Sequence, residues 1–555
     1  QQQFDGDVEG VEPQVSLYAR CATAILIGGV SYYVYSEHGH RIARHLPSWA
    51  HGSSGSQASS ESEEQQSHRP RRRLREALVP KSPMTQLDQV RWAWSHPGLY
   101  VVGSNEYGLA NPLHPGSGTG FKASVPGLEG RLLRAAAFAR THAAAVDANG
   151  NLYQWGTGFT GHNHPHMPQS TLRDPAIVAM AASPKYIVLL DRKSRIRLVR
   201  GETAASPGVS QLPDHPLPFE PSLGWREHVV AVSAGEDHVA ATTSAGHVYT
   251  CALSPNGNNR CQLGYHGEST TVQPFVLRRI QSTKPFGAAV CGGQHTLFLT
   301  TEGDVWGCGA NDFGQLAMGR FSEANRTVRN PTPLRSLWAA TSSDGFQPAL
   351  AHAVKVAAGA RTSYFVVERN GSNGSVEVLA SGCGIDGQLG SGAHTHMQGR
   401  PLSIAALSGR IEVDPVTGQR RPVGIRTLSV SGDHAVAVSD NHTNVVPNMV
   451  SSVEPLFGYD VMVWGSNSSG QCIPDRKHRF SEPEHPPPLY VSTTSAKSNG
   501  LNVPPLVRLQ AAPRQWVPAS GFMNLEPSTA PKSKKHLVEQ EFIAGPDVTA
   551  AFLKG

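Results

Sequence analysis

The sequence predicts an all-β fold, a seven-bladed β-propeller, and three observations lead to this prediction. Glycine (56 residues) and proline (41 residues) are abundant while charged residues make up only 16% of the chain, which suits many short strands joined by turns. A hairpin pattern recurs along the chain. The first and last copies of the pattern are each incomplete, and together they make one full copy, as in a closed ring of repeats.

The clearest copy of the hairpin pattern runs from residue 293 to residue 316. Two short apolar strands there flank a turn at Glu302 and Gly303, which is typical of a β-hairpin. Variants run over residues 141–156 and 235–249, and they keep Gly150 and Gly246 at the turn, where a positive φ is needed. The pattern therefore predicts a series of antiparallel hairpins.

A second motif follows each strand pair. It reads NEYGL at 105–109, CQLG at 261–264, GIDGQLG at 384–390 and NSSGQ at 467–471. Together the two motifs resemble the repeat of the RCC1 (regulator of chromosome condensation) family, which reads roughly GxxH, strand, turn, strand ending in WG, then NxxGQLG. The resemblance covers residues 92–555 at a period of about fifty residues. The repeat positions that carry it, to which we assign a structural role, are Gly103, His142, Trp155, Gly156, Gly235, His238, Gly293, His295, Trp306, Gly307, Gly314, Gly387, Gly432, His434, Trp464, Gly465 and Gly545.

The phase of the repeat predicts how the ring closes. Seven strands of the WG type end near Gly103, Gly156, Gly201, Cys251, Gly307, Gly382 and Gly465. Seven halves of the GxxH type begin near Arg140, Ala182, Gly235, Gly293, Gly359, Gly432 and Gly545. The first WG strand has no partner before it and the last GxxH half has none after it. We therefore expect the two chain ends to pair in one blade, which removes the exposed sheet edges.

The resemblance weakens in several places. Around residues 184–190 both the glycine and the histidine are missing, and Ser381 replaces the tryptophan. Three stretches near 321–350, 441–458 and 475–535 interrupt the period and are rich in proline, serine and polar residues. We expect these stretches to be loops or partly ordered arms, where binding commonly resides.

The N-terminal region divides into three segments ahead of the propeller at 90–555. Residues 1–16 are acidic, residues 17–36 form a candidate transmembrane anchor, and residues 37–89 form a polar and basic tether. The alternatives for the apolar run are a signal-peptide core and a buried strand. The acidic residues precede the run and the basic ones follow it, so the positive-inside rule predicts that the propeller stays on the cytoplasmic or matrix side. The first residue is Gln1, which suggests that a transit peptide has been removed.

Other motifs are expected to be structural. Residues 156–161 and 382–387 match GxGxxG, but neither is expected to open a helix, so they are interpreted as turns of the repeat. The repeated histidines are expected to tie their own blades together by hydrogen bonds, and a metal site at His162, His164 and His166 with His394 and His396 is not favoured. The seven cysteines lack CxxC spacing, which favours a reducing compartment. No cofactor and no metal are expected.

Two classes of function remain. The first is a membrane-anchored scaffold, because the chain resembles the fungal mitochondrial RCC1-like proteins, which are linked to assembly of inner-membrane respiratory complexes. That resemblance implies protein partners among respiratory-complex subunits or assembly factors. The alternative is guanine-nucleotide exchange on a small GTPase, although the propeller face and wedge-shaped insertion that the family uses match no residues here. We expect no enzyme, and a net charge of +5 is too small to argue for nucleic acid.

Overall fold

The computed structural model describes the chain from residue 86 onward. The described residues are 86–116, 124–160, 167–200, 216–265, 272–319, 323–340, 351–369, 375–413, 418–441, 443–444, 457–474, 476, 479–487, 508–525 and 535–555. All of them belong to the second of two units into which the chain divides, Arg72–Gly555. The predicted anchor at 17–36 and most of the tether lie outside the described residues. No helix of the described residues is long and apolar enough to span a membrane.

The described residues form an all-β propeller arrangement, and antiparallel hairpins are its unit. The first hairpin set consists of β2 (Leu133–Phe138), β3 (Ala143–Asp147), β4 (Asn151–Trp155) and β5 (Gln169–Arg173). The second has three strands: β6 (Ile177–Ala182), β7 (Tyr186–Asp191) and β8 (Ile196–Arg200). The third is β10 (Val229–Ala234), β11 (His238–Thr243), β12 (Val248–Ala252) and β13 (Leu277–Arg279), with the short parallel strand β9 (Phe219–Glu220) added outside.

Three further sets follow in the same order along the chain. One is β14 (Phe286–Cys291), β15 (His295–Thr300), β16 (Val305–Ala310) and β17 (Thr327–Pro333). The next is β18 (Ala351–Ala358), β19 (Thr362–Arg369), β20 (Ser375–Gly384) and β21 (Thr395–Ser403). The six-stranded set is β24 (Ile425–Ser431), β25 (His434–Ser439), β26 (Thr443–Asn444), β27 (Phe457–Gly465), β28 (Phe480–Glu484) and β29 (Gln510–Ala511).

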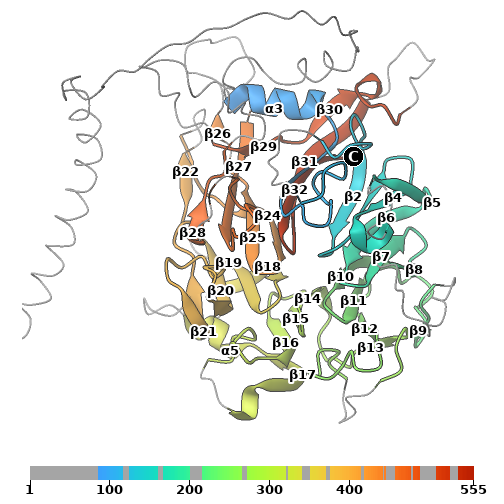
Figure 1. Cartoon of the computed structure of the whole chain (residues 1–555). Coiled ribbons are helices and arrows are strands. Elements are labelled where there is room, and N and C mark those ends of the chain that lie inside the picture. Colours follow the sequence, from blue (N-terminus) through green and yellow to red (C-terminus); the bar gives the residue numbers. More distant parts are fainter. Residues whose placement is uncertain are drawn as a thin grey trace, which may run out of the picture. The chain divides into compact units, whose positions relative to one another are not determined.

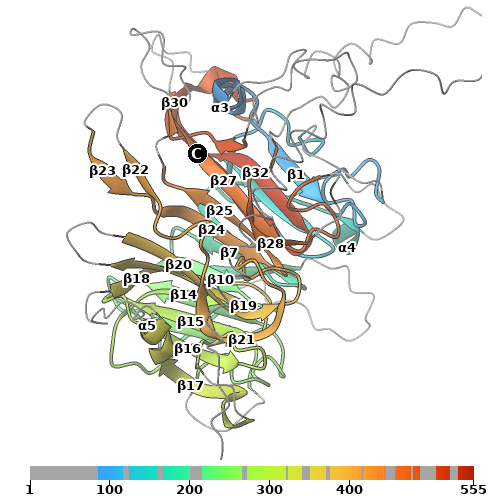
Figure 2. The same ribbon diagram turned by 90° about the vertical axis from the view of Figure 1, so that its left-hand side faces the viewer.

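The two ends of the described chain pair with each other. Strand β1 (Leu99–Gly103) runs antiparallel to β32 (Val548–Lys554), and β32 also pairs with β31 (Lys535–Gly545). The short strand β30 (Gln515–Pro518) extends this group. The predicted pairing of N- and C-terminal strands is therefore confirmed, and Figure 2 shows β1 beside β32.

The sheets differ from the seven separate blades that the repeat predicts, because only five of them have four or more strands. Leu133 of β2 pairs with Lys554 of β32, which joins the terminal strands and the first hairpin set into one eight-stranded sheet. The set β6–β8 has only three strands. Residue-level repetition thus does not translate into seven independent sheets.

The first strands of the hairpin sets meet around a common centre. Strands β2, β6, β10, β14, β18, β24 and β31 contact one another in this order, and β31 contacts β2. Figure 1 shows the sheets following one another in chain order around this centre. Apolar clusters fill the spaces between adjacent sheets; one of them joins Val146 and Leu152 of the first set to Ile187 and Leu189 of the second.

Several predicted loops are structured. Strand β17 and helix α5 (Arg335–Ala340) fall within the stretch expected to be a loop at 321–350, after the short helix η1 (Glu323–Asn325). Within 475–535, strands β28, β29 and β30 and helix η4 (Ala519–Gly521) are formed. Leu509 and Phe522 there are 2% and 3% exposed. Sequence composition hid these elements because each contributes only a few buried residues.

A helix and a two-stranded ribbon are further elements that were not predicted. Helix α3 (Gln86–Ser95) begins within the expected tether, and its Gln89 and Trp94 side chains donate hydrogen bonds to the carbonyls of Arg508 and Pro513. A two-stranded ribbon, β22 (Ile411–Val413) and β23 (Arg420–Pro422), is inserted between β21 and β24. Figure 2 shows this ribbon extending away from β24 and β25.

Candidate functional site

A pocket of about 700 Å³, the axial pocket, lies at the centre of the ring. It is where the first strands of the hairpin sets, the inner strands, meet; these are β2, β6, β10, β14, β18, β24 and β31. Each inner strand or the residues just after it contributes to the lining, and most of the lining side chains are alanine, glycine, serine or valine. Sequences such as Ala135-Ala136-Ala137 and Ala357-Ala358 on these strands have the small side chains that converging strands require. The centre of the ring is therefore open and nearly uncharged.

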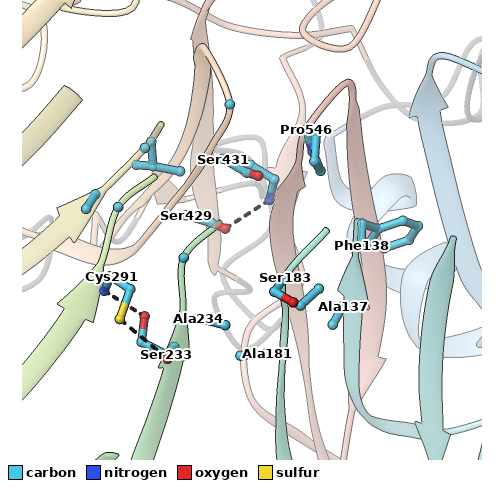
Figure 3. Close-up of a pocket in the computed structure, with 18 of the residues that line it drawn as sticks. Ala137, Phe138, Ala181, Ser183, Ser233, Ala234, Cys291, Ser429, Ser431 and Pro546 are labelled. Carbon is cyan, nitrogen blue, oxygen red and sulfur yellow. Dashed lines mark hydrogen bonds between the residues drawn. The ribbon is translucent and has the colours of Figure 1, made fainter. Parts of the chain in front are cut away.

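Hydroxyl groups on the inner strands tie neighbouring sheets together around the pocket. The backbone N–H of Cys291 donates to Ser233 Oγ at 2.9 Å, and that of Ala544 donates to Ser429 Oγ at 2.9 Å. Figure 3 shows both contacts at the pocket wall. The Cys291 thiol is buried, which raises its pKa to about 12, so it is a weak nucleophile at neutral pH.

Two glycines of the GxxH motif show why the ring needs a residue without a side chain at this point. A Cβ on Gly235 would lie 2.3 Å from the carbonyl oxygen of Gly292 in the next sheet. A Cβ on Gly545 would lie 2.5 Å from Cβ of Phe138. Neighbouring segments of the ring approach too closely here for any larger residue.

The loops that follow the inner strands form the rim of the pocket, which carries charges of both signs. Arg140 forms an ion pair with Asp547 at 3.4 Å and Arg361 with Asp433 at 3.7 Å. Gln294 Nε2 donates to Glu236 at 3.3 Å. Each of these contacts joins two neighbouring loops.

The rim carboxylates are held in unequal environments. Burial raises the pKa of Asp433, although the Arg361 charge opposes this shift. Burial likewise raises the pKa of Asp237, against a hydrogen bond from Ser254 and the charge of Lys185. The rim therefore presents a charge pattern that is fixed by the ring, and it is suited to recognising a partner surface.

The repeated histidines connect adjacent sheets, so the prediction that each ties its own blade is wrong. Their partners are hydroxyls of the following hairpin set at about 3 Å. The contacts are His238 Nε2 to Thr296 Oγ1 at 3.0 Å, His295 Nε2 to Ser363 Oγ at 2.9 Å and His434 Nε2 to Thr549 Oγ1 at 3.0 Å.

His142 is the exception among these histidines. It is fully buried, and neither ring nitrogen has a hydrogen-bond partner. The residue that corresponds to Thr296 in the next set is the apolar Ile187. Burial lowers the pKa of His142 to about 4, so the ring is neutral at physiological pH.

Trp155 and Trp464 occupy the same position of the repeat in their two sheets, and Trp306 occupies a different one. Their indole N–H groups donate to the carbonyls of Leu109 and Gln388 at 3.0 and 2.9 Å. Because His295 pairs with Gly309, the equivalent residue in that sheet is Cys308 rather than Trp306. Gly307 is likewise two residues away from the repeat position that Gly156 and Gly465 occupy. The register of the preceding histidine could have revealed this shift.

The remaining candidate residues lie in loops. Gly103 ends β1, and Gly293 and Gly432 lie in the rim loops. Gly314 and Gly387 follow strands β16 and β20, each in a turn. One GxGxxG match does open a helix, contrary to expectation, but α4 (Thr157–Thr160) has only four residues. His162, His164 and His166 lie outside the described residues. Within the described residues no group of three or more His, Cys, Asp or Glu could hold a metal ion.

Comparison with known families supports the repeat assignment. The family described as "Regulator of chromosome condensation (RCC1) repeat" matches residues 288–315. The chain is similar to RCC1-repeat proteins. The mitochondrial protein FMP25 of Saccharomyces cerevisiae is 23% identical over 440 residues, which cover 71% of this chain and 65% of FMP25. The probable human E3 ubiquitin-protein ligase HERC3 is 28% identical over 214 residues, 36% of this chain and only 19% of HERC3.

Two solved structures share the fold of this RCC1-like chain. Human WBSCR16 superimposes with a TM-score of 0.52 at 15% identity, covering 83% of this chain and 99% of that one. Prp20p of Saccharomyces cerevisiae gives a TM-score of 0.50 at 13% identity, covering 86% and 95%. At these identities the likeness concerns the fold alone.

Proposed function

We propose that this RCC1-like chain is a protein-interaction scaffold of mitochondria that supports assembly of respiratory-chain complexes. The observation that carries the proposal is the rim of the axial pocket, a set of loops with charges of both signs held by contacts between sheets. Such a surface binds by complementarity of shape and charge. Similarity to a yeast protein named as mitochondrial supports the location.

The proposal includes the anchor over residues 17–36, with the propeller on the matrix side of the inner membrane. The order of acidic, apolar and basic residues supports this orientation. Alkaline carbonate washing should leave the full chain in the membrane fraction. Protease added to mitochondria opened by osmotic shock should leave the propeller intact, and its digestion would contradict the matrix orientation.

The two ends of strand β7 offer a matched pair of variants for testing the rim. Lys185 lies in the rim loop before β7, and Lys193 lies in the turn after it; both are exposed. We expect the tagged full chain, captured from mitochondria in mild detergent, to bring down respiratory-complex subunits or their assembly factors. Lys185→Glu should reduce that capture about tenfold or more, a change of about 1.4 kcal/mol in binding free energy. Lys193→Glu should not change it.

Two results would contradict the proposal. One is capture that contains no respiratory-complex subunit or assembly factor. The other is equal capture by the two lysine variants, which would remove the rim from the binding surface. Guanine-nucleotide exchange is the alternative function and rests on the family resemblance alone.

A further inference from the structure

A second pocket, of about 540 Å³, lies at the other end of the inner strands from the rim. It is lined where β24 begins and β25 ends, by Gly424 to Thr427 and Asp440, and by residues of β18, β31 and β32. The rim loops, by contrast, follow the end of β24 and precede β25. The second pocket is therefore a separate site from the axial pocket.

Most charged side chains of this pocket are paired with one another. Glu539 accepts a hydrogen bond from Arg426, which is also stacked over Tyr459 at 4.7 Å, and forms a second ion pair with Arg514 at 3.4 Å. Burial acts to raise the pKa of Glu539, but the two arginines outweigh it and hold that pKa below its usual value. Lys554 pairs with Glu541 at 2.8 Å.

The other two carboxylates also have donors near them. Asp440 accepts from the backbone N–H of Gly424 at 2.6 Å and lies 3.9 Å from Arg421. Glu368 lies 3.9 Å from His352. Three of the four acidic groups of the pocket, Glu539, Glu541 and Asp440, thus have a cationic or backbone donor within the chain.

Lys355 differs from these groups because its contacts are neutral. Its Nζ donates to the backbone carbonyls of Ile425 and Arg426 at 2.8 and 2.6 Å. Within the described part of the chain no carboxylate oxygen lies within 4.0 Å of it. Burial lowers its pKa and the Arg426 charge adds to that effect, while the more distant Asp440 and Glu368 carboxylates oppose it. One of its three N–H groups remains for an external acceptor.

An exposed apolar pair lies next to the charged part of the pocket. Trp516 of β30 pairs with Leu537 of β31, and they are 59% and 37% exposed. Glu539 stands two residues along β31 from Leu537, so alternation places these two side chains on one face of the ribbon. Arg514, just before β30, lies on the same side because it forms the ion pair with Glu539. A ligand can therefore contact the apolar pair and the cations together.

We propose that this pocket binds an extended segment of a partner protein in which a carboxylate side chain neighbours an apolar one. The carboxylate binds to Lys355, with Arg514 lining the same pocket, because no carboxylate oxygen of the described residues lies within 4.0 Å of the Lys355 ammonium. The apolar side chain covers Trp516 and Leu537. This assignment rests on the proposed scaffold function and adds the chemistry of the segment that the scaffold recognises.

The probe for this site is a fluorescein-labelled synthetic peptide. It has nine residues, two adjacent leucines followed by two glutamates with glycine and serine elsewhere, and its matched control has glutamines in place of the glutamates. Titrated with the full chain, the acidic peptide should bind at least about tenfold more tightly than the control, as one charge-assisted hydrogen bond allows. Equal affinity of the two peptides, or no binding of either, overturns the proposal.

Variants locate the binding on the protein. Lys355→Gln and Arg514→Gln should each abolish most of the preference for the acidic peptide, and Trp516→Ala should weaken both peptides. Arg514 and Trp516 are largely exposed, so these variants keep the fold even if Lys355→Gln does not. Lys284→Gln is the control. It removes a lysine that lies outside this pocket and pairs with the exposed carboxylates of Glu302 and Asp304, and it should preserve the preference. A preference that survives Arg514→Gln and Trp516→Ala would overturn the assignment.

The two proposals can fail separately. If mitochondrial capture depends on Lys185 but the peptides do not discriminate, only the pocket assignment is wrong. If the peptides discriminate but no respiratory protein is captured, the pocket stands and the proposed function falls.

Discussion

At the scale of single residues, hydrogen bonds between sheets hold the ring. His434 Nε2 meets Thr549 Oγ1 at 3.0 Å, and both side chains are buried. Thr549→Val should destabilise the fold by about 1–3 kcal/mol, because it leaves a buried ring nitrogen without a partner. Thr242→Val is the matched control, since the Thr242 hydroxyl is buried without a hydrogen-bond partner, and it should be neutral or stabilising. Urea denaturation measures both, and equal effects would contradict this role of the hydroxyl.

The buried histidines also predict how stability depends on pH. Burial lowers the pKa of His434 and His238 to about 4 and that of His295 to about 3. The unfolded chain protonates its histidines near pH 6.5, so stability is full above that pH and is lost as pH falls toward the folded pKa. A shift from about 6.5 to about 4 corresponds to about 3 kcal/mol for each histidine.

Denaturation of His434→Asn at pH 7.5 and 5.5 tests this dependence. The variant should lose less stability between the two pH values than the parent chain, because it lacks one of the titrating groups. Identical losses in parent and variant would contradict the assignment of the titration to the buried histidines.

Residue-level prediction erred where another residue type takes the place of tryptophan in the repeat. The position of Trp155 is filled by Cys308 and Ser381 in other sheets, and these donate to the carbonyls of Gln262 and Gln315 as the tryptophans do to theirs. A search for tryptophan finds Trp306 instead, two residues out of register. These four sheets share a donor to the preceding loop rather than one residue type, which sequence letters do not display.

At the scale of elements, ring closure depends on β32. This strand pairs with β1 and β31, and its Val548, Ala550 and Phe552 are at most 2% exposed. Removing residues 546–555 should expose the edges of β1 and β31 and give a broad, less cooperative unfolding transition or aggregation. A synthetic peptide of residues 546–555 should restore cooperativity when added. A truncated chain that melts like the parent would contradict closure by this strand.

The insertions differ in how much they contribute to stability. Residues 508–525 bury Leu509, Ala512 and Phe522, and the Asn524 side chain accepts from Leu132 N and donates to Leu132 O at 3.0 Å each. Deleting 508–525 should therefore lower the free energy of unfolding by several kcal/mol, about as much as replacing two large buried side chains with alanine. Residues 508–525 are thus packed against the rest of the fold and do not form a free loop.

The β22–β23 ribbon provides the matched comparison. Its Ile411 and Val413 are 58% and 57% exposed, so replacing residues 411–422 with a short glycine–serine linker should change the urea midpoint little. Equal destabilisation by the two deletions would contradict the distinction. Composition did not separate the two insertions because both are rich in polar residues and proline.

At the scale of the whole molecule, the repeat pattern predicted the closed, all-β ring, and it did not predict where binding sites would lie. The axial pocket forms because the inner strands converge and carry small side chains. The second pocket depends on Lys355, Arg426 and Glu539, which lie on or beside strands of three different sheets. Residues so far apart in sequence meet only through the three-dimensional arrangement.

The central claim is that the chain binds its partners without promoting a reaction on them. Release of a fluorescent guanine nucleotide from mitochondrial small GTPases, measured with and without the purified full chain, tests this claim most directly. Our account predicts that the chain leaves the intrinsic release rate unchanged, even at concentrations that saturate its captured partners. Acceleration of release by orders of magnitude would contradict it and establish exchange activity instead.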